Sequence, residues 1–272
     1  MSDATRPHPL TPSPVRERGS ATVSSEIPVG DAAVPRLELK EWADAYGLVA
    51  GITTRGQGAG FSLGLWSDEP VGQVLSRWRA FRAAFAARFP TIVLSHQVHG
   101  AAVQWHETLP EGWLVLDGLD GHATQDPGVL LTITVADCIP VYLTVPQKGA
   151  LALLHAGWRG AAGGALPRAI ELLKWRAFAK GQDIVMHCGV GICGDCYEVG
   201  SEVAVHFGLP PGATAQRLDL RAVLVRQARE SGVEQCSLSP WCSAHDRGRF
   251  FSHRASGGRD GRMVAYLGRP KG

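Results

Sequence analysis

The stretch that decides the fold is the apolar run Val129–Val145, VLLTITV-ADC-IPVYLTV, which is broken once by Ala136-Asp137-Cys138. A second apolar stretch begins at Ala150 and ends at His155, where a glycine-containing turn follows. Runs of β-branched and apolar residues without polar alternation are typical of strands that are buried on both faces. The sequence therefore predicts interior strands that carry polar side chains at their ends.

Helical periodicity appears between these strands. One face of a helix predicted over residues 72–88 carries Val74, Trp78, Phe81 and Phe85. Further helices are expected over 166–178 and over 220–231, the latter with Asp219 as its N-cap and Gly232 as its stop. Additional strands are expected at 47–53, 92–94 and 233–238. Strands that alternate with helices predict an α/β fold in which helices cover mixed sheets.

The composition is that of an ordinary globular protein, with 272 residues, 45% hydrophobic and 19% charged residues and a net charge of +2. Lys and Arg form no long run, so neither nucleic acid nor a membrane is an expected partner. No apolar segment reaches the roughly 18 residues of a membrane helix, and no secretory signal is recognisable. We expect a cytoplasmic protein, a monomer or small homo-oligomer, whose six cysteines are reduced thiols or metal ligands.

Residues 1–35 form a separate compositional zone. They contain six prolines from Pro7 to Pro35 and few large apolar side chains. Such a segment cannot bury enough apolar surface to fold, so a disordered tail is expected, or a start codon placed too far upstream. The globular, catalytic domain is expected to cover residues 36–272 as a single unit.

Three potential metal ligands stand at or near the ends of apolar strands, beside a glycine or a break in the pattern. They are His99, Cys138 and His155. Ends of neighbouring strands in an α/β sheet converge at one edge, where ligand crevices form. Two imidazoles and a thiolate suit Zn²⁺ or copper and leave a coordination position open for catalysis. The alternative is that Cys138 is a small core residue and that the histidines satisfy internal hydrogen bonds.

A second group, His187, Cys188, Cys193 and Cys196, contains the pair Cys193-x-x-Cys196. Such a pair is typical of a redox motif or of half a zinc site. A closed structural zinc site needs four suitably placed ligands, and no second C-x-x-C is present. We therefore expect no metal at this segment.

The local motifs around the first three ligands narrow the alternatives. Gln97-Val-His-Gly100, Ala136-Asp-Cys-Ile-Pro140 and His155-Ala-Gly-Trp-Arg-Gly160 together resemble the YfiH-type family, also called laccase-domain or multicopper polyphenol oxidase-like proteins. The resemblance continues through Cys196-Tyr-Glu-Val-Gly200 and Phe250-Phe-Ser252 and covers most of residues 48–268. It implies a metal bound by His99, Cys138 and His155. It also implies a purine nucleoside phosphorylase that acts on adenosine, inosine and methylthioadenosine and deaminates adenosine.

The resemblance, together with the positions of neighbouring residues, suggests further roles. Arg159 follows a strand end and is expected to hold phosphate and assist catalysis, and Arg55 is a second phosphate candidate. Asp137 is a candidate acid or base, or a residue that orients a ligand histidine, although a strand-end cap is equally compatible. Trp158 is either a stacking surface for the base or core packing.

Several positions depart from the family pattern, including Ser62-Leu-Gly64, Gly189-Val190, His253 and Ala255. The expected ligands are intact, whereas the expected substrate rim is altered. Two other functions therefore stay open. One is a hydrolase that edits a UDP-muramyl amino acid precursor of peptidoglycan, and the other is a catalytically impaired relative that keeps its metal for stability. A laccase-type copper oxidase is disfavoured, because multicopper chemistry needs more histidine ligands than the motifs supply.

Overall fold

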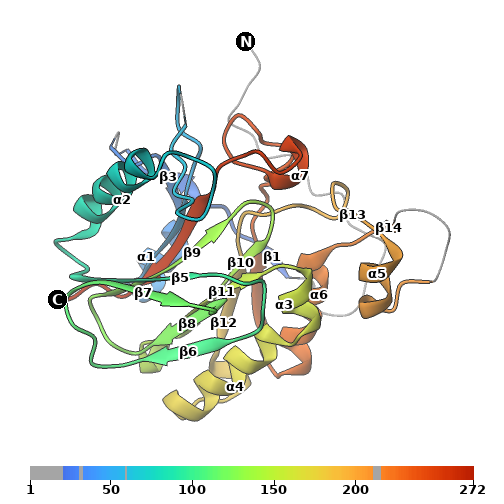
Figure 1. The fold of residues 1–272 in the computed structure, drawn as a ribbon. Helices are drawn as coiled ribbons and strands as arrows, with labels where there is room; N and C mark the ends of the chain where they lie inside the picture. Colours follow the sequence, from blue (N-terminus) through green and yellow to red (C-terminus); the bar gives the residue numbers. More distant parts are fainter. Residues whose placement is uncertain (1–20, 31–32, 59, 211–215) are drawn as a thin grey trace.

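The computed structural model describes residues 21–30, 33–58, 60–210 and 216–272 (Figure 1). Two seven-stranded mixed sheets form its centre. Sheet A runs, from edge to edge, through Thr22–Val23 (β1), Gln235–Leu238 (β15), Val185–Cys188 (β12), Ile139–Val145 (β10), Ala150–Ala156 (β11), Gly121–Thr124 (β8) and Val103–His106 (β6). Sheet B runs through Ile27–Pro28 (β2), Arg36–Glu38 (β3), Val49–Thr53 (β4), Met263–Gly268 (β16), Val129–Val135 (β9), Thr91–His96 (β5) and Gly112–Asp117 (β7).

Smaller elements surround the two sheets. A two-stranded pair consists of Glu198–Val199 (β13) and Gln216–Arg217 (β14). The α-helices are Lys40–Tyr46 (α1), Val71–Phe85 (α2), Trp158–Ala162 (α3), Ala165–Ala177 (α4), Ser201–Ala204 (α5), Leu220–Glu230 (α6) and His253–Ser256 (α7). Short 3₁₀ turns cover Pro146–Lys148, Gly181–Asp183 and Val205–Phe207. No helix in the described ranges is both long and apolar enough to cross a membrane.

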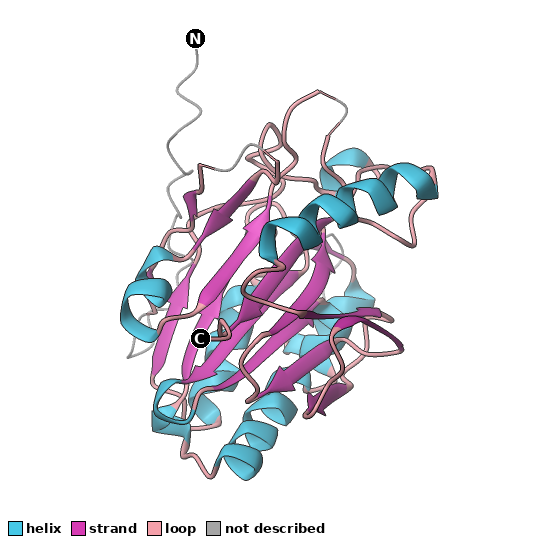
Figure 2. Cartoon of the chain, turned by 90° about the vertical axis from the view of Figure 1, so that its left-hand side faces the viewer, coloured by secondary structure: helices cyan, strands magenta, loops and turns pink. Residues whose placement is uncertain are grey.

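The sheets face each other, and helices cover their outer faces (Figure 2). Side chains of β9 and β16 meet those of β11 in the buried layer between the sheets, as Ile133, Ala265 and Leu153 illustrate. The outer face of sheet B packs against α2, and that of sheet A packs against α4 and α6. Strands enclosed in this way are apolar on both faces, which explains the unbroken apolar runs in the sequence.

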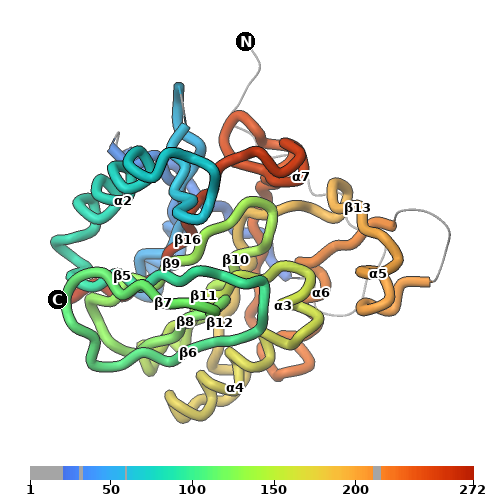
Figure 3. Tube along the Cα trace, viewed as in Figure 1, coloured from blue at the N-terminus to red at the C-terminus, as the bar shows by residue number. Residues whose placement is uncertain are grey.

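The predicted fold class is confirmed: the protein is a single α/β domain in which helices cover mixed sheets. The apolar stripe predicted for residues 72–88 is the buried face of α2, and the helices predicted at 166–178 and 220–231 are α4 and α6. Asp219 is the N-cap of α6, because its side chain accepts a hydrogen bond from the Ala222 amide at 3.1 Å. The run 129–145 forms two strands, one in each sheet, and the chain passes directly from β9 to β10 (Figure 3).

Of the tail predicted over residues 1–35, residues 1–20 and 31–32 lie outside the described ranges. The described remainder contains two short strands. β1 adds to β15 at the edge of sheet A, and β2 adds to β3 at the edge of sheet B. Backbone pairing and a few buried side chains anchor this segment, although its proline content is high.

Glu26 is the main anchor between β1 and β2. Its side chain is 1% exposed. One carboxylate oxygen accepts a hydrogen bond from the Ser239 hydroxyl at 2.6 Å, and the other lies 3.2 Å from Nε2 of His187. The Trp241 indole N–H donates to the Glu26 carbonyl at 3.3 Å. A carboxylate buried at this depth is tolerated because each of its oxygens has a partner.

We expect Glu26→Ala to lower the free energy of unfolding by about 3 kcal/mol, because it leaves buried polar partners unsatisfied. Urea denaturation of the full chain measures the change. Asp44→Ala is the control. It removes an exposed pair with Lys40 whose side chains are both 64% accessible, so a change within about 0.5 kcal/mol is expected. Equal effects of the two substitutions would show that the segment around Glu26 is not part of the folded unit.

Candidate metal centre

Three side chains from distant parts of the sequence converge at the junction of the two sheets. His99, Cys138 and His155 each offer a donor atom, and these atoms all lie within 4.8 Å of one another. The imidazole rings of His99 and His155 are 4.8 Å apart between centroids and nearly perpendicular. We call this set the His-Cys-His cluster.

The cluster forms where the chain changes sheets. His99 lies on the connection from β5 in sheet B to β6 in sheet A, and Cys138 lies on the connection from β9 in sheet B to β10 in sheet A. His155 lies near the end of β11, and the antiparallel register pairs it with Pro140, two residues after Cys138. The predicted convergence at a strand end is therefore present, although it occurs between two sheets and not along the edge of one.

Gly157 gives the cluster its close packing. A Cβ atom at this position would lie 3.0 Å from Sγ of Cys138 and 3.5 Å from the His99 ring. A side chain here would therefore crowd the Cys138 thiol, while its contact with the His99 ring would be of ordinary length. The small size of glycine after the strand favours this close approach.

Two residues of the connections have positive φ angles although they are not glycines. His99 has φ 57° and Asp137 has φ 86°. For residues with a Cβ atom such conformations are uncommon and cost free energy, and they persist where the surrounding contacts enforce them. Both connections are thus held in a strained shape at the cluster.

Asp120 supplies those contacts for the first connection. Its carboxylate, 1% exposed, accepts hydrogen bonds from three successive amides, those of Val98, His99 and Gly100, at 3.2, 3.0 and 2.7 Å. One oxygen also lies 2.8 Å from Nδ1 of His155. Burial raises the pKa of Asp120, but the bonds to His155 and to the amides outweigh it, and the net shift is downward. Asp120 thus fixes the orientation of His155, whose Nε2 remains available to a metal.

The electrostatics of the cluster favour a thiolate. Burial raises the pKa of Cys138, yet the imidazoles of His155 and His99 outweigh burial and lower it to about 6. Burial lowers the pKa of His155, whereas Cys138 and Asp120 raise it to about 9. In the absence of a metal, a thiolate–imidazolium pair is therefore the expected state at neutral pH.

Arg159 lies on the exposed side of α3, and its guanidinium stacks on the Trp158 ring at 4.5 Å. Tyr197, which is half-buried, lies within electrostatic range of both Cys138 and Arg159. Burial and, after it, the charge of Cys138 raise the pKa of Tyr197 to about 12. Arg159 therefore lies in the first turn of α3, two residues after Gly157, and Tyr197 lies within electrostatic range of both Arg159 and Cys138.

Arg55, the second phosphate candidate, already has partners within the protein. Its guanidinium forms an ion pair with Asp260 at 2.5 Å and stacks on the Phe251 ring at 4.3 Å. Asp260 also accepts a hydrogen bond from the Ser252 amide, so Arg55 fastens two parts of the C-terminal loop.

Asp137 has both carboxylate oxygens engaged. One accepts a hydrogen bond from the Ser243 hydroxyl and the other from the Arg254 amide, each at 2.6 Å. The carboxylate that contacts a histidine of the cluster is that of Asp120, which the motifs did not single out. A buried aspartate opposite a candidate ligand histidine is recognisable only once the strands are paired.

The four residues grouped from the sequence, His187, Cys188, Cys193 and Cys196, do not form one cluster in the structure. His187 and Cys188 are buried within β12, where His187 contacts Glu26 and Ser237. Cys193 and Cys196 instead lie beside Cys242 and His245. The spacing Cys242-x-x-His245 was the signal that could have identified these partners.

Fold and site define an α/β protein with a His-Cys-His donor cluster at the junction of two sheets. The chain belongs to the family described as multi-copper polyphenol oxidoreductase laccase, whose model matches residues 49–270. It is 32% identical to a Geobacillus stearothermophilus protein named purine nucleoside phosphorylase YlmD, over 82% of this chain and 90% of that protein. It is 29% identical to adenosine deaminase RL5 from an unknown prokaryote, over 81% and 94% of the two chains.

The fold agrees with this family. The crystal structure of YlmD from Geobacillus stearothermophilus superposes with a TM-score of 0.81 at 30% identity and covers 90% of this chain and 100% of that one. The resemblance expected from the three motifs is thus confirmed.

The lowered pKa of Cys138 predicts its reactivity. In metal-free protein, alkylation of Cys138 should fall as pH drops through about 6, because the reactive thiolate becomes protonated. His155→Ala removes the largest favourable partner and should slow alkylation at pH 7 by about 10-fold or more. Peptide mass spectrometry after timed labelling resolves this thiol from the others.

His96→Ala is the matched control, since His96 also pairs with an aspartate, Asp117, but is exposed and outside the cluster. It should leave the labelling profile of Cys138 unchanged. A labelling midpoint near pH 9 in the unsubstituted protein would contradict the electrostatic argument.

Proposed function

We propose that this protein is a metal-dependent purine nucleoside phosphorylase that acts on adenosine, inosine and methylthioadenosine, with adenosine deaminase as a side activity. The observation that carries the proposal is the convergence of His99, Cys138 and His155, within 4.8 Å, in a chain related to proteins that bear these two names. A cytoplasmic location and a monomeric or small oligomeric state stay predictions.

The donor set fits a single Zn²⁺ or copper ion. Two imidazole nitrogens and a thiol of lowered pKa are suitable ligands, and Asp120 holds His155 in one tautomer. Three protein ligands leave a fourth position open, as in catalytic zinc sites. When bound there, the ion would supply Lewis-acid polarisation of a substrate oxygen.

The protein side chains account for the other requirements of phosphorolysis. Phosphate must be held in line with the ribose carbon while the purine departs, and the planar, charged guanidinium of an arginine suits this anion. Arg159 is the principal candidate and Arg55 a second one, although the ion pair of Arg55 with Asp260 favours a role in holding the loop. The rings of Trp158 and Tyr197 are candidate surfaces for the purine.

We propose that Asp137 is a positioning residue, which holds the backbone next to Cys138. Its hydrogen bonds to Ser243 and Arg254 occupy the carboxylate oxygens, which supports a role in fixing the strained connection that carries Cys138.

The alternatives are less well supported. No relative described above is named as a hydrolase of peptidoglycan precursors, so the UDP-muramyl substrate becomes an outcome of the test. Multicopper oxidation is not proposed either. In the described part of the chain the donor clusters contain only three histidines between them, fewer than that chemistry needs.

Purified, metal-loaded protein should release hypoxanthine from inosine only when phosphate is present, and ammonia from adenosine at a lower rate. Chelation of the metal should abolish both activities. Cys138→Ser should lower kcat/KM by about 100-fold or more, since it removes the thiolate ligand.

Cys236→Ala is the control for cysteine replacement, because Cys236 is buried in sheet A outside either donor cluster. It should keep full activity. Turnover of a UDP-muramyl serine substrate without nucleoside turnover would replace this proposal, and inactivity towards both substrates in metal-replete protein would leave a non-catalytic relative.

Arg159→Gln should raise the KM for phosphate by about 10-fold or more, with a smaller change in the KM for inosine, because a charged contact to the anion is lost. Steady-state kinetics with each substrate varied separate these effects. Arg226→Gln, at an exposed arginine on α6, should leave both constants unchanged. An equal rise in both KM values for Arg159→Gln would argue against a phosphate contact.

A further inference from the structure

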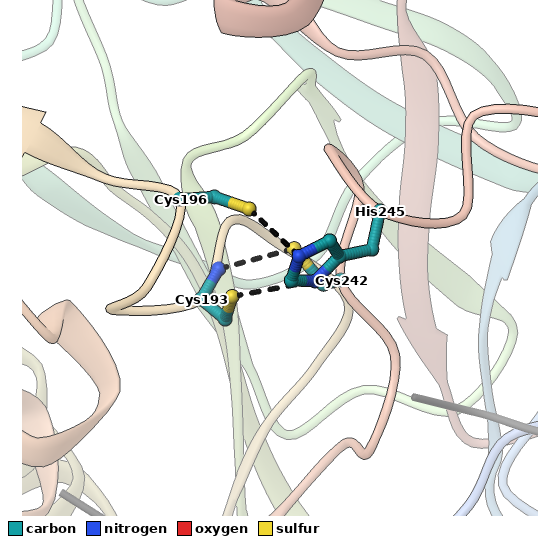
Figure 4. Close-up of side chains that lie close together, drawn as sticks. All are labelled: Cys193, Cys196, Cys242 and His245. Carbon is teal, nitrogen blue, oxygen red and sulfur yellow. Dashed lines mark hydrogen bonds between the residues drawn. The ribbon is translucent and has the colours of Figure 1, made fainter. Parts of the chain in front are cut away.

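A second set of donor atoms lies in the loops beyond β12 and β15. Cys193, Cys196, Cys242 and His245 turn their side chains toward one another (Figure 4), and their donor atoms all lie within 4.8 Å of one another. The His245 ring lies between two of the thiols, with Nδ1 at 3.7 Å from Sγ of Cys193 and Nε2 at 3.3 Å from Sγ of Cys196. We call this set the Cys₃His cluster.

The fold brings the two halves of this cluster together. β12 and β15 are parallel neighbours, so the loops that follow them leave from the same end of sheet A. Gly191 and Cys242 continue the pairing as an isolated parallel bridge, and the Ser243 amide donates to the Gly191 carbonyl at 3.1 Å. The Cys193 amide then donates to Sγ of Cys242 at 3.3 Å.

Each half is a tight turn that presents two ligands on one side. The Cys196 amide donates to the Cys193 carbonyl at 3.1 Å, and the Asp246 amide donates to the Cys242 carbonyl at 2.9 Å. Turns of this kind place side chains three residues apart next to each other. The resulting pattern, C-x-x-C and then C-x-x-H, has the short ligand spacing of structural zinc sites.

A buried guanidinium reinforces the same loops. The Arg221 side chain is 3% exposed in the interior, and one of its nitrogens donates to the carbonyls of Gly189, Gly191 and Trp241. Both loops are therefore held at their bases, so the four ligands are brought together by the fold and need no metal to find one another.

The types of donor atom indicate which metal ion the Cys₃His cluster would bind. Three thiols and one imidazole make a closed, four-coordinate shell for Zn²⁺. With bonds of about 2.3 Å to sulfur and about 2.0 Å to nitrogen, a sulfur and a nitrogen ligand of a tetrahedral ion lie about 3.5 Å apart. The His245 nitrogens lie at comparable distances, 3.7 and 3.3 Å, from the thiols of Cys193 and Cys196. A disulfide would use two of the three thiols and leave one beside a histidine. We propose that the Cys₃His cluster is a second, structural zinc site, separate from the His-Cys-His cluster.

The loops that carry the Cys₃His cluster also contact Asp137, next to the His-Cys-His cluster. The Ile192 amide, one residue before Cys193, donates to the Asp137 carbonyl at 2.8 Å. The Ser243 hydroxyl, one residue after Cys242, donates to the Asp137 carboxylate at 2.6 Å. A zinc ion joining the two loops would therefore clamp the positive-φ Asp137 from both sides and, through it, hold Cys138 in place.

Metal content of the full chain tests the proposal. Protein produced without an affinity tag and reconstituted anaerobically with Zn²⁺ should hold two zinc ions per chain by elemental analysis. His245→Ala, at an exposed ligand, should hold one, and so should the double substitution His99→Ala with Cys138→Ala. Cys236→Ala should keep two.

The double variant isolates the second site from the fate of the proposed catalytic one. X-ray absorption of its zinc should show three sulfur neighbours at about 2.3 Å and one nitrogen at about 2.0 Å. Chelation should lower its Tm by about 5 °C or more, whereas the same variant with His245→Ala added should show no such fall.

A single zinc ion in the reconstituted wild-type chain, bound by the His-Cys-His cluster, would overturn the proposal. So would a zinc shell with fewer than three sulfurs in the double variant. A disulfide among Cys193, Cys196 and Cys242 that persists during anaerobic preparation, detected as a mass 2 Da lower, would do the same.

Discussion

The buried carboxylate of Asp120 is the contact on which the site depends. It holds three successive amides of the β5–β6 connection and, at the same time, the imidazole of His155 in β11. Because that connection passes from one sheet to the other, a single side chain fixes both the path of the chain and the placement of the His99 and His155 imidazoles relative to each other. The free energy of these hydrogen bonds offsets the cost of burying the charge and of the positive φ at His99.

Both donor clusters lie where neighbouring strands end and the chain turns away. In one, the crossings between sheets bring an imidazole and a thiol to the end of β11. In the other, the loops after two parallel strands bring Cys193 and Cys196 beside Cys242 and His245. Asp137 lies between them, bonded to the loops of one cluster and adjacent in sequence to the thiol of the other.

The sequence predicted those features of the fold that depend on residues close together in the chain. The apolar stripe of α2, the N-cap at Asp219 and the interior strands of 129–145 follow from side-chain periodicity and were found where expected. The division of 129–145 between two sheets was not predictable, because strand partners lie far away in sequence. Asp120 was overlooked for the same reason, as was the pairing of Cys193 with His245, which depends on the loops after β12 and β15 being adjacent.

The order of strands in sheet B has a consequence for synthesis of the chain. β16, residues 263–268, lies between β4, residues 49–53, and β9, residues 129–135, and pairs with both along its length. Until residue 263 has left the ribosome, two apolar strands have no neighbour on their facing edges. Unpaired strand edges of this kind are prone to pair with other chains, so the central position of the last strand lengthens the period in which the nascent chain is open to aggregation.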